Sequence, residues 1–132
     1  MKYNEFVGHV QNRARLGTQG ETVRAIRATL ETLGERLVTD EANHLAAQLP
    51  QEIGHYLRQV DTTDRFSLNE FFQRVAERET IDMPEAAYHA RAVISVLTEA
   101  VTPNQLEHVR GQLPDEFEPL FTSGSEGEMN AS

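Results

Sequence analysis

Apolar side chains recur along this chain in alternating steps of three and four residues, the spacing that lines one face of an α-helix. Between residues 20 and 37 the apolar positions are Val23, Ile26, Leu30, Leu33 and Leu37; between residues 84 and 101 they are Ala87, Ala90, Ile94, Leu97 and Val101. No segment demands a strand by alternating apolar and polar residues. The pattern predicts an all-α fold with helices over residues 3–14, 20–37, 40–49, 51–59, 67–79, 84–101, 103–112 and 115–121.

Helix-start signals agree with these boundaries. Thr18 precedes Glu21 by three residues, and Ser67 precedes Glu70 by three, which is the spacing of a capping box. Asp82 stands in the same position before the helix over residues 84–101. Prolines, which suit the first turn of a helix, fall at Pro50, Pro103 and Pro114.

The two halves of the chain repeat each other. Asn4-Glu5-Phe6 matches Asn69-Glu70-Phe71 at an offset of 65, and Gln48-Leu49-Pro50 matches Gln112-Leu113-Pro114 at an offset of 64. A one-residue gap after the first helix reconciles the two offsets. We therefore expect two tandem four-helix repeats, over residues 3–59 and 67–121, packed about a pseudo-twofold axis into one globular helical bundle, residues 1–121. Residues 122–132 are rich in Gly, Ser and Glu, and we expect them to form a disordered acidic tail.

The order and duplication of the motifs resemble the prokaryotic domain of unknown function 2267, particularly its archaeal members from salty habitats. The resemblance covers about residues 3–121 and rests on Tyr3-Asn4-Glu5-Phe6, Gly20-Glu21-Thr22-Val23-Arg24-Ala25, Thr32-Leu33-Gly34-Glu35-Arg36-Leu37, Leu49-Pro50 and Leu113-Pro114. It implies a helical, two-repeat fold without an established activity, and it supplies no catalytic residues.

Charge and composition narrow the classes of partner. Twenty-one acidic residues against twelve basic ones give a formal net charge of −9, and Lys2 is the only lysine. An acidic surface repels phosphate groups, so we expect no nucleic-acid partner and no membrane partner. Two alternative explanations fit the scarcity of lysine: adaptation to a salty cytoplasm, or a genome whose codon usage favours arginine. The chain has no cysteine, no recognisable signal peptide and no segment long and apolar enough to span a membrane, so we expect a cytoplasmic protein.

A metal site is the sharpest chemical hypothesis. Glu41 and His44, like Glu52 and His55, follow the Glu-x-x-His spacing with which helices of carboxylate-bridged di-iron bundles present metal ligands. The second repeat keeps neither pattern, and His55 should lie off the buried face beside Ile53. Glu41 and Glu52 also fall in first helical turns, where a carboxylate is favoured electrostatically. We favour this structural explanation, and we predict no cofactor.

Several polar residues recur at equivalent positions in the two repeats: His44 and His108, Gln48 and Gln112, Arg27 and Arg91, Glu35 and Glu99. The histidines could line a groove between the repeats, or they could be partly buried and donate hydrogen bonds to carbonyl groups. The arginines and glutamates could form a buried pair within each repeat or between repeats. An arginine pair that binds a carboxylate or phosphate ligand is the functional alternative.

The sequence contains no recognisable set of catalytic residues. It has neither a phosphate-binding Gly-x-x-x-x-Gly-Lys loop nor a Gly-x-Ser-x-Gly nucleophile motif. We therefore expect a non-catalytic helical interaction module that docks a partner protein or self-associates through an exposed apolar patch or groove. The alternative is a helical protein, either a binding protein or an enzyme, that holds a metal or small ligand through Glu41, His44, Glu52 and His55.

Overall fold

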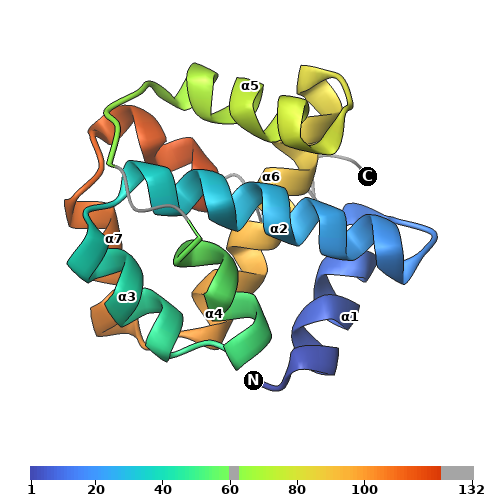
Figure 1. The fold of residues 1–132 in the computed structure, drawn as a ribbon, viewed down its shortest axis with the longest axis horizontal. Helices are drawn as coiled ribbons and strands as arrows, with labels where there is room; N and C mark the ends of the chain where they lie inside the picture. Colours follow the sequence, from blue (N-terminus) through green and yellow to red (C-terminus); the bar gives the residue numbers. More distant parts are fainter. Residues whose placement is uncertain (60–62, 123–132) are drawn as a thin grey trace.

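The computed structural model describes residues 1–59 and 63–122, and all regular elements within these ranges are helical (Figure 1). They are α1 (Tyr3–Ala14), α2 (Gln19–Arg36), α3 (Thr39–Ala47), α4 (Gln51–Leu57), α5 (Leu68–Glu79), α6 (Met83–Ala100), α7 (Pro103–Gly111) and the 3-10 helix η1 (Asp115–Phe117). The all-α prediction is confirmed. The predicted tail lies outside the described residues from residue 123 onward.

The helix starts follow the capping chemistry of the sequence. The side-chain oxygens of Thr18, Ser67 and Asp82 each accept a hydrogen bond from the backbone N–H three residues later. The expected helix over residues 115–121 differs in form, because it opens as a 3-10 turn at Asp115–Phe117 before helical residues 118–122. The N-cap residue Pro114 has an extended backbone, so η1 begins as a separate turn and does not continue α7.

Two long helices, α2 and α6, form the centre of the molecule and pack against each other. Helix α1 packs on α6, α5 packs on α2, and α3 packs on α7, so elements from the two halves of the chain alternate through the bundle (Figure 1). The core is continuous and includes Phe6, Phe71 and Phe117, each at most 1% exposed. The ring of Phe71 meets that of Phe117 edge-on at 6.1 Å between centroids, a favoured aromatic geometry.

Helix α4 lies unusually close to α2. A Cβ atom added at Gly34 of α2 would lie 2.5 Å from the carbonyl oxygen of Leu57 in α4. On the other side of α4, a Cβ at Gly54 would lie 2.6 Å from the carbonyl oxygen of Ala46 in α3. These two glycines therefore fix how deeply α4 sits against its neighbours.

Candidate functional site

The four candidate metal ligands do not converge. Glu41 is buried in α3, whereas His44, Glu52 and His55 are exposed. The side chain of His55 contacts that of Gln59 one turn further along the chain. Within residues 1–59 and 63–122 no three His, Asp or Glu side chains form a group that could hold a metal ion. The prediction that His55 lies off the buried face is confirmed.

Glu41 is held instead by amides from the other half of the chain. One carboxylate oxygen accepts a hydrogen bond from Nε2 of Gln105, and the other accepts one from Nε2 of Gln112 at 3.3 Å. Glu41 and Gln105 occupy equivalent positions in the two halves, at an offset of 64. The carboxylate thus joins α3 to α7, which gives its burial a structural reason.

The repeated glutamines cap helices across the molecule. Oε1 of Gln48 accepts a hydrogen bond from the backbone N–H of Thr102, the N-cap of α7, at 2.9 Å. In return, Oε1 of Gln112 accepts one from the N–H of Val38, the N-cap of α3, at 3.4 Å. Each glutamine therefore binds a backbone donor that no intrahelical carbonyl can reach.

The expectation that His44 and His108 are partly buried and donate hydrogen bonds to carbonyl groups is wrong, because both side chains are exposed. The reason is angular: Ala42, Leu45 and Val109 take the buried face of α3 and α7, which turns the histidines outward.

The expected arginine–glutamate pairs form with different arginines. Arg27 is exposed and pairs with Glu31 one turn along α2, and the guanidinium of Arg91 lies 5.9 Å from the centre of the Phe72 ring. The glutamates instead pair across the bundle. Glu35 in α2 binds Nη1 of Arg78 in α5 at 2.7 Å, and Glu99 in α6 binds Nη2 of Arg13 in α1 at 2.8 Å. A crossing pair was anticipated, but Arg27 and Arg91 were the wrong partners.

A comparison of the two halves of the sequence identifies the arginines that pair with Glu35 and Glu99. Arg13 and Arg78 are separated by 65 positions, which is the offset that relates the first helices of the two halves. Both stand near the end of their helices, three residues after buried Val10 and Val75. The helical spacing therefore predicts that Arg13 and Arg78 lie beside the apolar face of their helices, where a long side chain can reach the neighbouring helix.

A buried acid–base pair joins α5 to α6. Nδ1 of His89 donates to Oε1 of Glu79 at 2.8 Å, and the two residues are only 5% and 3% exposed. The hydrogen bond to Glu79 raises the pKa of His89 above its ordinary value, against the opposing effect of burial. The second carboxylate oxygen of Glu79, Oε2, is buried and has no hydrogen-bond partner in the structure. This pair was not predicted, although a histidine directly beside Ala90 on an apolar stripe could have drawn attention to it.

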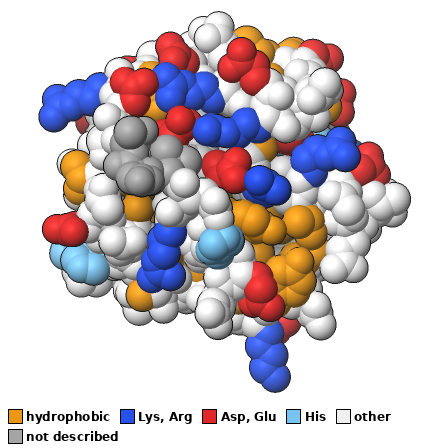
Figure 2. Space-filling view, viewed as in Figure 1, with side chains coloured by type: hydrophobic (Ala, Val, Ile, Leu, Met, Phe, Trp, Pro, Cys, Tyr) orange, Lys and Arg blue, Asp and Glu red, His pale blue; other side chains and the backbone are white. Residues whose placement is uncertain are grey.

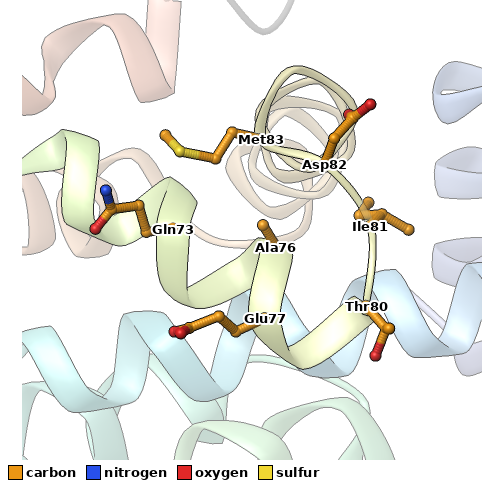
Figure 3. A pocket seen from close by; sticks show the side chains of 7 residues that line it. All are labelled: Gln73, Ala76, Glu77, Thr80, Ile81, Asp82 and Met83. Atoms are coloured by element: carbon orange, nitrogen blue, oxygen red, sulfur yellow. The ribbon is translucent and has the colours of Figure 1, made fainter.

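An open hollow of about 830 Å³ lies beside this pair, at the connection from α5 to α6 (Figure 3). Its lining comes from α5, the connecting loop and the start of α6: Gln73, Ala76, Glu77, Thr80, Ile81, Asp82 and Met83. Met83 extends from the first turn of α6 in the direction of Gln73, and the side chain of Glu77 runs along α5 (Figure 3). The hollow contains no histidine or arginine, and its two carboxylates do not converge, so it offers no catalytic arrangement.

A second surface feature combines aromatic and charged side chains. Figure 2 shows hydrophobic side chains gathered between α1 and α4, below α2. We give the name aromatic patch to three partly buried residues that pack against the core, namely Tyr3 of α1, Val23 of α2 and Tyr56 of α4. Burial raises the pKa of the Tyr56 hydroxyl, with a further contribution from Tyr3 and an opposing one from Arg27. Tyr56 therefore lies near both Tyr3 and the charged surface of α2.

The charges beside the aromatic patch continue into a network between α2 and α5. Glu31 pairs with Arg27 and faces Arg78, and Glu35 pairs with Arg78 and with Arg74. Each arginine of this network therefore has a carboxylate partner, which leaves little excess positive charge for an anionic ligand. The predicted alternative of an arginine pair that binds a carboxylate or phosphate finds no support in this geometry, because Arg27 and Arg91 engage different neighbours.

Comparison with known proteins adds the family but no activity. A family model described as an uncharacterized conserved protein (DUF2267) matches residues 3–120. No curated protein matches the chain. Among the helices that the structure describes, none is long and apolar enough to cross a membrane.

Proposed function

We propose that this chain, which belongs to the DUF2267 family, is a non-catalytic helical module that binds a partner protein through the aromatic patch. The observation that carries the proposal is the pair of tyrosines Tyr3 and Tyr56. Both are partly exposed, they come from helices far apart in the sequence, and they lie close enough for Tyr3 to contribute to the raised pKa of Tyr56. Val23, the third residue of the patch, is also partly buried and stands on α2 one helical turn before Arg27.

The chemistry of the patch suits a protein partner. A tyrosine presents a large apolar ring together with a hydroxyl that can hydrogen-bond, and tyrosines are enriched among the residues that dominate binding energy at interfaces. Arg27, Glu31 and Glu52 surround Tyr56 with both signs of charge, which is the character of an interface rim. Two copies of this chain, each with a net charge of −9, repel each other, so the occupant we propose is a different protein.

We further propose that the module is built from two tandem repeats related by a pseudo-twofold axis. Reciprocal contacts support this arrangement: Gln48 with Thr102 and Gln112 with Val38, Arg13 with Glu99 and Arg78 with Glu35. Helix α1 packs on α6 as α5 packs on α2, which is the exchange that such an axis requires. The absence of cysteine supports a reducing, cytoplasmic location, and the acidic, lysine-poor composition suits a salty one.

The metal-binding alternative has no comparable observation behind it. Glu41 is engaged by two amides, and His44, Glu52 and His55 are exposed on α3 and α4. We therefore favour the interaction module over a metal-dependent activity as the function of this chain.

Site-specific photo-crosslinking tests the proposal. A photoreactive phenylalanine derivative replaces Tyr56, and a matched variant carries it at Glu107, an exposed residue of α7. We expect one protein to crosslink in the native host from position 56 and not from position 107, and to be lost when Tyr3 is also changed to Ser. The absence of an adduct, or the same adducts from both positions, would contradict the proposal.

A further inference from the structure

A small cavity of about 70 Å³ lies where the two helical corners of the molecule meet. One corner joins α1 to α2 over residues 14–18, and the other joins α5 to α6 over residues 79–82. The cavity is lined by two pairs of residues that are equivalent in the two halves, Leu16 with Ile81 and Glu21 with Glu85, and by Arg24, Glu79 and His89.

The backbones of the two corners match closely. Arg15 and Thr80, at an offset of 65, both adopt the left-handed conformation, with φ of 55° and 60°. The next N–H in each corner closes the same hydrogen bond, from Leu16 to the carbonyl of Gln11 at 3.0 Å and from Ile81 to that of Ala76 at 3.1 Å. The two corners are therefore one local structure built twice.

Their buried side chains differ in one respect. The positions equivalent to Glu79 and His89 are Ala14 and Ala25 in the first half of the chain. All four residues are at most 5% exposed. The first corner thus forms with two alanines, which shows that this local structure does not require a buried carboxylate and imidazole.

The Glu79–His89 pair is also a costly way to fill the space. Removing two charges from water is expensive, and replacing a buried ion pair by apolar groups is often neutral or stabilising. Here the cost is incompletely offset, since Oε2 of Glu79 has no partner. A buried charge pair that the first corner does without, and whose burial is costly, calls for another role.

We propose that the Glu79–His89 pair makes the α5–α6 corner pH-responsive, closed while His89 is protonated and opening locally when His89 loses its proton. The protonated imidazole neutralises the buried carboxylate. The neutral imidazole still donates one hydrogen bond through Nδ1, but it leaves a buried charge that only solvent can stabilise. Because Glu79 is the last residue of α5, unwinding the final turn exposes it and releases the left-handed Thr80.

The charges around the pair favour this direction. Glu21 and Arg24 of α2 and Glu85 of α6 line the same cavity, and Tyr88 adjoins His89 on α6 with ring centroids 6.3 Å apart. The carboxylates of Glu79, Glu85 and Glu21 all raise the pKa of His89. The proton therefore binds more tightly to the closed corner, so closure is fully favoured below the ordinary histidine pKa of 6.5 and is lost as pH rises through the raised value.

Amide hydrogen exchange on the full chain tests this inference, with the first corner as an internal control. After correction for intrinsic rates, we expect the protection of Thr80 and Ile81 to fall about tenfold for each pH unit between 6.5 and the folded-state pKa of His89. The protection of Arg15 and Leu16 should stay constant. In parallel, NMR titration should give the His89 ring a pKa above the ordinary histidine value of 6.5.

The double variant Glu79→Ala/His89→Ala restores the residues of the first corner. We expect it to fold and to show no difference in pH dependence between the two corners. Three results would each overturn the inference: equal pH dependence of both corners in the wild type, a His89 pKa at or below 6.5, or a double variant that keeps the difference. Because His89→Ala alone leaves the buried carboxylate of Glu79 without its partner, we expect Thr80 and Ile81 of that variant to exchange rapidly even at pH values where the wild-type corner is closed.

Discussion

The close approach of α4 to α2 gives the sharpest stability prediction, through Gly34→Ala. The new Cβ would lie 2.5 Å from the carbonyl oxygen of Leu57 and 3.2 Å from its carbonyl carbon. Both atoms belong to the backbone, so no side-chain rotation relieves the contact. Since ordinary contact begins at 3.4 Å, α4 must move away from α2 by about 0.9 Å, the difference between 3.4 and 2.5 Å.

Two opposing effects set the magnitude. Overpacking of a close-packed interior costs about 1–3 kcal/mol, and a clash between two backbones belongs at the upper end. Alanine in place of glycine within a helix recovers about 1 kcal/mol. We therefore expect Gly34→Ala to lower the free energy of unfolding by about 2 kcal/mol.

Gly8→Ala is the matched control. Gly8 is exposed within α1, and a Cβ there meets no atom within 4 Å, so only the helix propensity remains and stability should rise by about 1 kcal/mol. Urea unfolding followed by circular dichroism measures both variants. If Gly34→Ala proved as stable as the wild type while Gly8→Ala gained stability, the close approach of α4 would be refuted.

Three further predictions concern the core and the charges. Phe71→Ala should cost about 3–5 kcal/mol in urea unfolding, because Phe71 is fully buried against Phe117, whereas the half-buried Phe72 should cost distinctly less. The hydrogen bond from Arg13 lowers the pKa of Glu99, so the stability from this pair is present above about pH 4.5 and is lost as pH falls through the lowered pKa. In Arg13→Gln, carbon-detected NMR should find the Glu99 pKa raised toward 4.5; an unchanged value would contradict the pairing. Glu41→Gln should lose less stability than Glu41→Ala, because its amide oxygen can still accept from Gln105 although its NH2 group cannot accept from Gln112. Glu41→Ala should lose about 1–3 kcal/mol, and equal losses in the two variants would contradict this role.

Local patterns predicted the helices well because each boundary has a short-range chemical cause. Thr18, Ser67 and Asp82 cap the helices that they precede, and the steps of three and four identified buried residues such as Ile26 and Leu97. The last element was less predictable. A 3-10 turn and an α-helix share their first hydrogen-bonding residues, so the composition of residues 115–121 does not separate them.

Pairings between helices were harder to predict, since periodicity gives the face of a residue but not its partner. The sequence predicts buried pairs of Glu35 and Glu99 with Arg27 and Arg91, yet the partners come from α5 and α1, and the Glu99 side chain is 52% exposed. The Glu79–His89 pair was missed for a related reason. Two positions ten residues apart on different helices show their relation only when the corner between them is known.

The central claim is that a partner protein binds at the aromatic patch. The affinity of the crosslinked partner for purified variants tests this claim most directly. We predict that Tyr56→Ala weakens binding at least about tenfold, as expected for a tyrosine at the centre of an interface, while Glu107→Gln on α7 leaves the affinity unchanged. Circular dichroism at the same temperature establishes that both variants are folded. Equal affinities for Tyr56→Ala and the wild type would contradict the account, because the partner would then bind elsewhere on the molecule.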